Sequence, residues 1–510
     1  MKKHRFYSFN RILITASVLL FGISLAQAQS FLGTSGDQLW SNPDNWLDGL
    51  KPNEESEQVL INADVIVDED VVVRNLYDAV PCTLTIQSGK KLTVTSTIVW
   101  DKGGDFILDD NAQLVNDYPV QVTVKKSITA HEYSDHFWDV IASPVSNDII
   151  PSTENGFLTD SLTRFVLYSY DEATHQFINY KDSPFPIVNG KGYLYANTFD
   201  TTLLFSGLTH GSATPFEVSL DYTANGTFVG GNLVGNPLPC NAYTDRSYYV
   251  MYETGEMLIP ISASSSTAVM PCMGIFAKAD AANETIHFSR TSNAQLTHNQ
   301  GYIEISATYS NSQNILLDKA IVSYNPEDNL SKFIYNGRFP RLFFTENDQD
   351  LAIISIDSLD VLPLRFKPVV DSTYTLRFET KELDIEYLHL IDNMTGANIN
   401  LLTSPNYTFD ATSNDYASRF KLVFNPNYDV EEYENEEFAY YLNGVIYLYG
   451  VETFRETSLQ MVDMSGRIVL NEPITGRDGE CTVSARLVPG VYVLRLVQGN
   501  KIRVQKMAVK

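Results

Sequence analysis

The stretches EQVLINADVIVDEDVVV (57–73), CTLTIQSGKKLTV (82–94) and STIVWDKGGDFILDDNAQLV (96–115) decide the expected fold of the first domain, residues 29–130. In each stretch, short apolar strands alternate with polar turns, and no segment is long enough for a crossover helix. This rhythm favours a short parallel β-solenoid, in which each rung buries its apolar face on the next rung. A meander within a β-sandwich is the alternative.

A tryptophan pair precedes these rungs, in LWSNPDNWLDGLKP (39–52). The segment resembles a recurrent opening of secreted bacterial surface proteins, in which W-x-x-x-x-N-W and G-x-x-P precede LTI-x-x-G-x-x-LTV repeats. Trp40 and Trp46 could stack on a sugar ring. We favour the alternative that they cap the solenoid, because the end of a solenoid core has to be covered.

The rest of the chain has the pattern of an all-β, multidomain protein. Runs rich in Val, Ile, Tyr, Phe and Thr alternate with Gly, Asn, Asp and Pro clusters. Short strands punctuated by turns over residues 300–426 predict a β-sandwich. Region 131–299 contains a loose repeat, in which WDVIASPV, GKGYLYA and TTLLFS are followed by GNLVGNPL, PCMGIFA and ETIHFS. We interpret it as a two-copy duplication, with chance similarity between β-strands as the alternative.

The N-terminal segment, residues 1–28, has the layout of a secretory signal peptide. Basic residues precede the apolar run ILITASVLLFGISLA and a small-x-small site, which predicts cleavage between Ala28 and Gln29. The run is shorter than the roughly 20 residues that a membrane-spanning helix needs. We therefore expect export by the Sec machinery and no membrane-spanning segment after cleavage. Loss of four basic residues would change the formal charge from −26 to −30, which argues against nucleic acid as a partner.

The sequence contains no recognisable signature of catalysis, cofactor binding or metal binding. It has no G-x-S-x-G, P-loop or G-x-G-x-x-G motif. HEYSDH (131–136) differs from the zinc motif H-E-x-x-H, because a five-residue step on a helix would direct its two histidines apart. We therefore name no catalytic residue, no cofactor and no metal ligand, and we favour a protein without enzymatic activity.

Two kinds of covalent modification are hypotheses at this stage. Cys240 and Cys272 could form a disulfide in an oxidising compartment, although the sequence does not establish the geometry. The pattern D-[ST]-[AILVMT] resembles the O-glycosylation acceptor of some Gram-negative periplasmic systems. About two matches are expected by chance, and the chain has matches at Ser161, Thr201, Ser358 and Ser372.

Two adjacent segments precede the last domain. EYLHLIDNMTGANINLLTSPNYTFDATSNDYASRFKLVF (386–424) resembles a segment of many uncharacterised secreted proteins of Gram-negative bacteria. That resemblance implies a shared architecture and no known chemistry. NYDVEEYENEEF (427–438) then contains six acidic residues. A calcium loop is one hypothesis, but the spacing is not that of an EF-hand, so we favour an extended, solvated linker.

The last module, residues 439–510, is predicted to form an Ig-like sandwich of about six strands. LQMVDMSGR (459–467) and PGVYVLRL (489–496) closely resemble motifs of the type A C-terminal sorting domain of type IX secretion substrates. The matching residues are Asp463, Gly466, Arg467, Gly490, Tyr492, Arg495, Gly499 and Lys506. The resemblance implies that the protein first enters the periplasm and is then recognised by the outer-membrane type IX machinery. A β-domain without a sorting role is the alternative.

These features together predict a secreted or cell-surface protein, which we interpret as an adhesin or as a protein that binds glycans or host proteins. One alternative is a polysaccharide lyase or hydrolase with a site on the solenoid or between modules. A structural surface component is the other. A groove with converging carboxylates would favour the enzyme.

Overall fold

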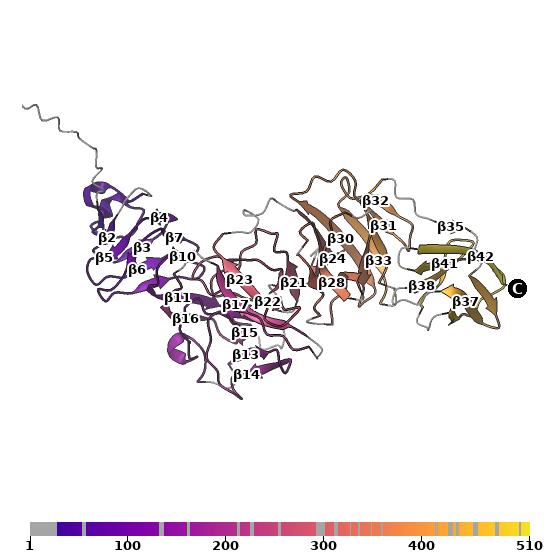
Figure 1. Cartoon of the computed structure of the whole chain (residues 1–510), viewed down its shortest axis with the longest axis horizontal. Coiled ribbons are helices and arrows are strands. Elements are labelled where there is room, and N and C mark those ends of the chain that lie inside the picture. The colour runs from indigo at the N-terminus through magenta and orange to yellow at the C-terminus, as the bar shows by residue number, and fades with distance from the viewer. Residues whose placement is uncertain are drawn as a thin grey trace, which may run out of the picture.

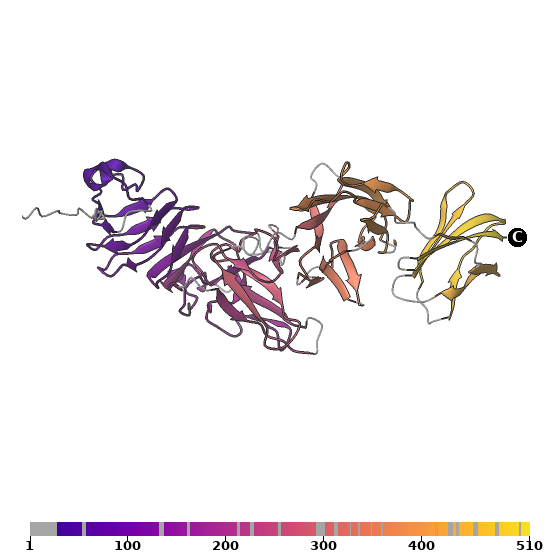
Figure 2. The same cartoon turned by 45° about the horizontal axis from the view of Figure 1, so that its top comes forward.

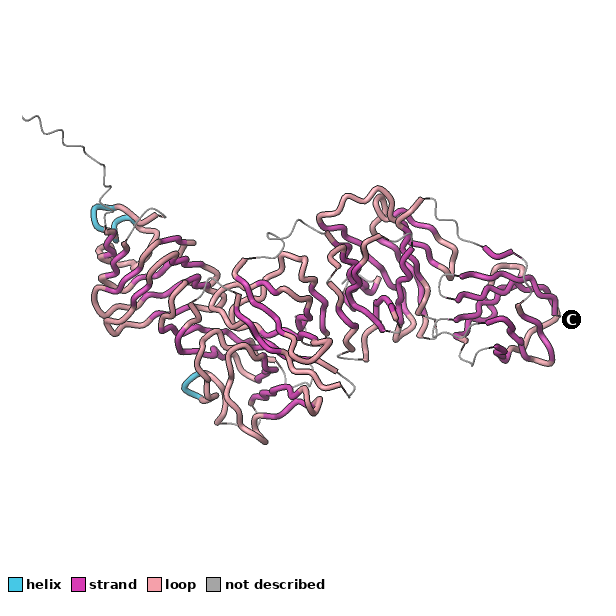
Figure 3. The backbone as a smooth tube through the Cα atoms, viewed as in Figure 1, coloured by secondary structure: helices cyan, strands magenta, loops and turns pink. Residues whose placement is uncertain are grey.

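The computed structural model shows an elongated row of β-domains (Figures 1 and 2). Within the described residues, the only helices are short 3₁₀ turns: η1 (Pro43–Asn45), η2 (Leu47–Gly49) and η3 (Thr153–Asn155) (Figure 3). The prediction of an all-β, multidomain fold is thereby confirmed. No helix in this part of the chain is both long enough and apolar enough to cross a membrane.

The structure describes most of the chain after the predicted signal peptide. The described residues are 28–53, 58–131, 137–160, 164–211, 215–224, 229–252, 255, 257–291, 301–310, 315–326, 328–334, 337–347, 349–358, 361–413, 415, 417–426, 432–434, 438–451, 457–474, 479–498 and 501–509. Residues 1–27 of the signal peptide, most of the acidic segment 427–438, most of HEYSDH, Ser161 and Gly499 therefore lie outside the described residues.

The first domain is a parallel β-solenoid with three faces. The first face contains β1 (Gln29–Phe31), β2 (Val59–Ile61), β5 (Leu76–Asp78) and β8 (Ile98–Val99). The second contains β3 (Val65–Val67), β6 (Leu84–Ile86), β9 (Phe106–Leu108) and β11 (Gln121–Ile128), and the third contains β4 (Val71–Val73), β7 (Lys91–Val94) and β10 (Gln113–Asn116). Neighbouring strands on each face are parallel. Alternate residues, such as Leu84 and Ile86, are fully buried, as the period of two requires. The sandwich meander is therefore excluded for this domain.

Both ends of the solenoid core are covered. At the first end, the rings of Trp40 and Trp46 lie edge to face with centroids 4.7 Å apart, and Trp46 Nε1 donates to the carbonyl oxygen of Trp40 at 2.8 Å. Both side chains are buried, so they act as core residues and leave no ring face for a sugar. At the other end, the backbone N–H of Leu114 in β10 donates to the carbonyl oxygen of Pro239 at 2.8 Å.

Strand β11 joins the solenoid to the next region. It pairs in parallel with β9 and antiparallel with β16 (Thr201–Leu208). One continuous core extends from Phe31 to Phe205. The expected boundary at residue 130 is therefore not a boundary between sheets, because β16 covers the edge that the last rung would leave open.

Two modules with the same strand order follow. In module 1, strands β11 to β16, one sheet has the order β12-β15-β13-β14: β12 (Asp139–Ala142), β15 (Gly192–Asn197), β13 (Phe165–Asp171) and β14 (Gln176–Asn179). In module 2, strands β17 to β23, the corresponding order is β18-β22-β20-β21: β18 (Gly231–Gly235), β22 (Gly274–Lys278), β20 (Tyr248–Met251) and β21 (Leu258–Ile261). The other strands of module 2 are β17 (Phe216–Ser219), β19 (Tyr243–Thr244) and β23 (Thr285–Ser289). The register agrees too, because Ala142 lies opposite Gly192 as Gly235 lies opposite Gly274.

The modules contact each other through equivalent residues. The N–H of Ala142 donates to the carbonyl oxygen of Cys272, and the N–H of Gly235 donates to that of Gly190, each at 3.0 Å. Cys272 and Gly190 both have a left-handed backbone, with φ of 59° and 80°. A Cβ added at Gly235 would lie 2.3 Å from the Cβ of Ala142. The contact is thus reciprocal, like an isologous dimer interface within one chain.

The sandwich domain is a single hydrogen-bonded path of strands. Its order is β32-β31-β34-β29-β27-β28-β25-β24-β30-β33, and β26 pairs with β28. The bounds are β24 (Tyr302–Tyr309), β25 (Leu316–Ser323), β26 (Leu330–Ser331), β27 (Arg341–Glu346), β28 (Gln349–Ser355), β29 (Val361–Lys367), β30 (Ser372–Lys381), β31 (His389–Asp392), β32 (Asn398–Asn400), β33 (Asn406–Ala411) and β34 (Phe420–Val423). Phe344, Phe366 and Phe420 are among its core residues.

The motif at 386–424 forms a buried ion pair in this domain. Arg419 Nε lies 3.0 Å from Asp392 Oδ1, and Arg419 Nη2 lies 2.7 Å from Asp392 Oδ2. Tyr407 donates its hydroxyl to Asp392 at 2.8 Å, and the guanidinium lies over the ring of Phe409 at 4.5 Å. Burial raises the pKa of Asp392, but the hydrogen bonds and charge of Arg419 outweigh it and hold the pKa below its usual value. The motif is therefore structural.

The C-terminal module contains two facing sheets. One has the order β35-β42-β41-β38-β39 and the other β36-β37-β40. The bounds are β35 (Glu432–Glu434), β36 (Ala439–Leu442), β37 (Val445–Val451), β38 (Thr457–Asp463), β39 (Ile468–Pro473), β40 (Gly479–Ser484), β41 (Gly490–Gln498) and β42 (Lys501–Val509). Leu448, Leu459 and Leu494 are buried in its core.

Candidate functional site

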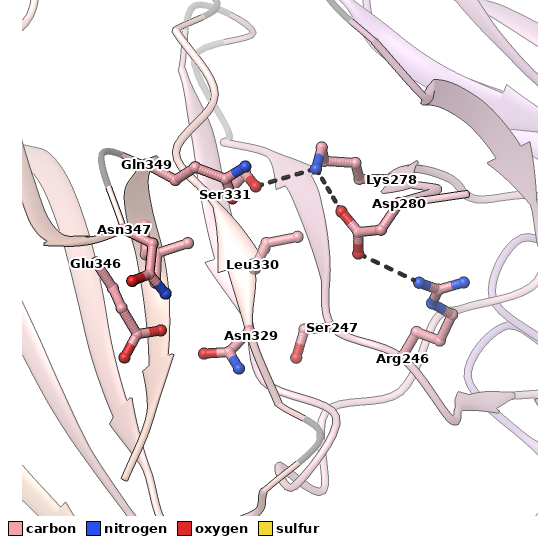
Figure 4. Close-up of a pocket in the computed structure, with 11 residues that line it drawn as sticks. Arg246, Ser247, Lys278, Asp280, Asn329, Leu330, Ser331, Glu346, Asn347 and Gln349 are labelled. Atoms are coloured by element: carbon pink, nitrogen blue, oxygen red, sulfur yellow. Dashed lines mark hydrogen bonds and ion pairs between the residues drawn. The ribbon is translucent and has the colours of Figure 1, made fainter. Parts of the chain in front are cut away.

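A polar cleft lies between module 2 and the sandwich domain (Figure 4). Its volume is about 350 Å³, within the range of small-ligand sites. Figure 4 shows the module side chains on one side of Leu330 and the β27–β28 side chains on the other. The cleft is lined by Arg246, Ser247, Lys278, Asp280, Asn329, Leu330, Ser331, Glu346, Asn347, Gln349 and Leu351.

The charged residues of the module wall are paired with one another. Lys278 Nζ lies 2.5 Å from Asp280 Oδ1 and donates to Ser331 Oγ at 3.1 Å, so it links module 2 to the sandwich. Arg246 Nη1 lies 2.5 Å from Glu284 Oε2, and Arg246 Nη2 lies 3.7 Å from Asp280 Oδ2. The charges that this wall presents to the cleft are therefore paired with one another.

The sandwich wall carries neutral amides at the ends of strands. Asn329 precedes β26, and its Oδ1 accepts the N–H of Ser355 at 2.8 Å, which fixes its orientation. Asn347 lies in the turn between β27 and β28, Gln349 is the first residue of β28, and both are exposed. Asn347 has a φ of 48°, which asparagine tolerates better than most residues. The turn thus projects amide donors and acceptors toward the module wall.

A second hollow adjoins the cleft and is partly aromatic. Its volume is about 680 Å³, and it shares Lys278, Asp280, Ser331 and Gln349 with the cleft. Tyr222 and Phe333 contribute its partly exposed rings, whereas Tyr249 and Phe276 are buried in its wall. The Tyr249 hydroxyl donates to the carbonyl oxygen of Ser331 at 2.6 Å and accepts the N–H of Phe333 at 3.1 Å. Burial raises the pKa of this hydroxyl far above its usual range, so it remains protonated.

A buried carboxylate holds the two walls together. Asp328 of the sandwich is 1% exposed and accepts hydrogen bonds from the hydroxyls of three module serines, Ser247, Ser262 and Ser264. The same segment contributes Leu330 to an apolar cluster with Leu233 and Phe276 of module 2. A buried charge without such partners would be costly, so these contacts fix the module and the sandwich relative to each other.

The cleft presents polar groups to a ligand, and one of its two carboxylates is engaged in ion pairs. Its carboxylates are Asp280, which is bound to two cations, and Glu346, which projects from the opposite wall (Figure 4). Retaining and inverting enzymes both use two carboxyl groups that flank the scissile bond: one is the general acid, and the other is a nucleophile or a general base. No group of His, Cys, Asp and Glu among the described residues is suited to hold a metal ion.

Residues 30–338 match the sequence model of a family described as a domain of unknown function, DUF8693. The chain belongs to the DUF8693 family. Among curated proteins, none matches it. The DUF8693 segment includes the solenoid, both modules and the sandwich up to the residues after Phe333. It thus supplies the whole module wall of the cleft, whereas the β27–β28 turn lies beyond it.

Two solved structures show weak similarity to this DUF8693 chain. A biofilm-associated protein BSP domain has 9% identity and a TM-score of 0.12, with coverage of 78% of this chain and 65% of that chain. A tetra-tandem repeat in the extending region of a large adhesion protein has 9% identity and a TM-score of 0.11. The match covers 77% of this chain and 100% of that chain. The DUF8693 chain therefore spans about two-thirds of the length of the first. TM-scores this low leave its function to be argued from its own structure.

None of the predicted modification sites that the structure describes lines the cleft of this DUF8693 protein. Cys240 and Cys272 are buried free thiols in different core clusters, so the suggested disulfide is not formed. Thr201 is half-buried and donates its hydroxyl to the carbonyl oxygen of Gly156, and Ser372 is half-buried in β30. Ser358 is exposed. Ala28 is exposed, and β1 begins at Gln29.

The sorting-motif residues within the described part of the chain are distributed over one sheet and its turns. The carboxylate of Asp463 accepts hydrogen bonds from the hydroxyl of Ser465 at 2.5 Å and from the backbone of Arg467, and the Ser465 bond is the largest cause that lowers its pKa to about 2. Gly466 provides the left-handed residue of this turn, with φ of 82°. Tyr492 lies opposite Asp463 and donates its hydroxyl to the carbonyl oxygen of Val488 at 2.8 Å.

The remaining motif residues that the structure describes lie on strands. Gly490 opens β41, Arg495 lies within it, and Lys506 is exposed on β42. None of the residues that line the cleft was singled out from the sequence. They come from four separate segments between residues 246 and 351, and no local motif connects Lys278 with Gln349.

Proposed function

We propose that this DUF8693 protein is exported to the cell surface or secreted, and that it binds glycans in the cleft between module 2 and the sandwich without cleaving them. The observation that carries the binding proposal is the lining of the cleft: neutral amides and hydroxyls on a fixed frame, beside a hollow with aromatic rings. Such groups match the hydroxyls and the apolar ring faces of sugars.

The paired charges support binding without turnover. Lys278 and Arg246 neutralise Asp280, so no pair of free carboxylates converges in the cleft. A glycan hydroxyl can still accept from Lys278 or donate to Asp280, because each group has further hydrogen-bonding capacity. A glycan ligand, like the adhesin role that the sequence suggests, fits a protein outside the cytoplasm.

The export part of the proposal rests on sequence resemblance. The layout of residues 1–28 suggests passage through the inner membrane by the Sec machinery. The motifs around Asp463 and Tyr492 resemble type IX sorting motifs, which suggests recognition at the outer membrane after transit through the periplasm.

The binding proposal is tested with the purified full chain on a panel of immobilised polysaccharides. Wild type should be retained by at least one polysaccharide and should release no reducing ends. N347A/Q349A should lose retention about tenfold or more, because one or two hydrogen bonds are worth about 1 kcal/mol each. Gln87→Ala, an exposed amide on the solenoid, is the matched control and should bind like wild type.

Each other outcome contradicts a stated part of the proposal. Released sugar would overturn binding without turnover and favour the enzyme. Retention that N347A/Q349A does not change would remove the cleft as the site. No retention on any polysaccharide, with retention on proteins, would favour a protein ligand.

A further inference from the structure

The sandwich domain buries a lysine and an aspartate that the cleft does not use. Asp318 lies on β25, and Lys332 follows β26. Their side chains are 7% and 5% exposed. Lys332 Nζ lies 2.6 Å from Asp318 Oδ1 and 2.6 Å from Asp318 Oδ2. Since the two oxygens of a carboxylate flank its carbon, Nζ lies within about 3 Å of Cγ, the distance of a near-attack arrangement.

Burial shifts the pKa values of the two groups toward each other. Burial lowers the pKa of Lys332, and the neighbouring Arg341 adds to this effect against the opposing attraction of Asp318. Burial also raises the pKa of Asp318. This effect is larger than the opposing effects of Lys332 and the backbone hydrogen bonds, so the net shift is upward. One proton transfer along the 2.6 Å contact converts the ion pair into an amine and a carboxylic acid. A neutral amine is the nucleophilic form of lysine.

Two further features suit a condensation. The N–H of Leu342 donates to Asp318 Oδ2 at 2.7 Å, where it would stabilise negative charge that develops on this oxygen. A cavity of about 30 Å³ is lined by Asp318, Lys332, Phe333, Phe339 and Arg341. A cavity of roughly 10–15 Å³ suffices for one water molecule, so there is space for a leaving water beside the two groups.

We propose that Lys332 and Asp318 condense to an intramolecular isopeptide bond. Nζ attacks Cγ, and Oδ2 carries the charge of the tetrahedral intermediate under the N–H of Leu342. The bond from Cγ to Oδ1 then breaks, and Oδ1 leaves as water with its own proton and one proton from Nζ. The products are one amide and one water, and no oxidant, cofactor or second substrate is needed.

The cross-link would tie β25 to the segment that forms one wall of the cleft. Lys332 lies between Ser331, which binds Lys278 of module 2, and Phe333, whose N–H binds Tyr249. A covalent bond at this point would keep the segment attached to β25 when the chain is extended. The proposal is independent of glycan binding.

The test is the intact mass of the denatured full chain, compared between wild type and variants prepared in the same way. Lys332→Arg cannot form the bond, so it should be heavier than wild type by the mass difference between arginine and lysine plus one water. Asp318→Ala should likewise be one water heavier than the substitution alone explains. Lys319→Arg changes the neighbouring lysine, which pairs with Glu304. This variant should still form the bond and should therefore have a mass one water below that of its sequence. Fragment spectra of a digest should show a branched peptide that joins residue 318 to residue 332.

A wild-type mass that fits the uncondensed sequence would overturn the proposal and leave an ion pair. Loss of one water in Lys332→Arg, or a cross-link located at other residues, would overturn it as well. Because mass is measured after denaturation, loss of folding in a variant does not affect the result for wild type.

Discussion

Removal of Arg419 should destabilise the sandwich domain strongly. The side chains of Arg419 and Asp392 are 3% and 0% exposed and are joined by two hydrogen bonds. Arg419→Met keeps much of the side-chain volume but leaves the Asp392 carboxylate buried without its cation. Removal of one partner of a buried ion pair costs about 3–5 kcal/mol. For a domain of this size, that loss corresponds to a fall in Tm of roughly 10–25 °C.

Hydrogen exchange measured by mass spectrometry is the suitable assay, because it reports each domain of a multidomain chain separately. Peptides that contain β31 and β34 should lose about 3–5 kcal/mol of opening free energy, whereas solenoid peptides should not change. The double variant D392L/R419M should recover most of the loss, since no buried charge remains.

The matched control is Arg377→Met in the same domain. Arg377 pairs with Glu379 at 2.6 Å, but its side chain is 61% exposed. An exposed pair contributes only about 0–1 kcal/mol, so this variant should resemble wild type. If Arg419→Met also stays within about 1 kcal/mol of wild type, the reasoning about the buried pair is refuted.

Three further predictions concern the contact between the modules, the buried Asp392 and the last domain. Gly235→Ala should weaken the contact between the modules by about 1–3 kcal/mol, because the added Cβ would meet Ala142. Gly337 has open space around it, so Gly337→Ala is the control and should leave hydrogen exchange unchanged. The pKa of Asp392 is lowered in the folded state, so the ionised carboxylate stabilises the sandwich fully above the usual Asp pKa of about 3.9. This contribution should be lost as the pH falls below that value. A sandwich as stable at pH 2 as at pH 6 would contradict the prediction. Deletion of residues 439–510 should leave the protein in the periplasm of its host, and normal surface delivery of the shortened chain, measured by cell fractionation, would argue against a sorting role.

Local patterns account for what the sequence predicts well. Apolar residues at every second position gave the solenoid strands, because each rung buries the same alternate residues. The burial of Trp40 and Trp46 followed from the need to cover a solenoid end. The equivalence of Gly192 and Gly274 could be suspected from the sequence, since each glycine precedes an aromatic strand.

Long-range contacts account for what could not be predicted. The pairing of β11 with β16 joins residues about 80 positions apart and extends the solenoid sheet into module 1. The reciprocal contact of Cys272 and Gly190 depends on how the two modules pack, and no local rule specifies it. The cleft likewise exists only because Asp328 docks on Ser247 and Ser262, so its residues carry no sequence signature.

A crystal structure of the full chain with an oligosaccharide of the retained polysaccharide would test the central claim most directly. The account predicts an intact oligosaccharide between Lys278 of module 2 and Asn347 and Gln349 of the sandwich, with a sugar ring toward the aromatic hollow. A cleaved sugar, or an oligosaccharide bound on the solenoid or elsewhere with the cleft empty, would contradict it.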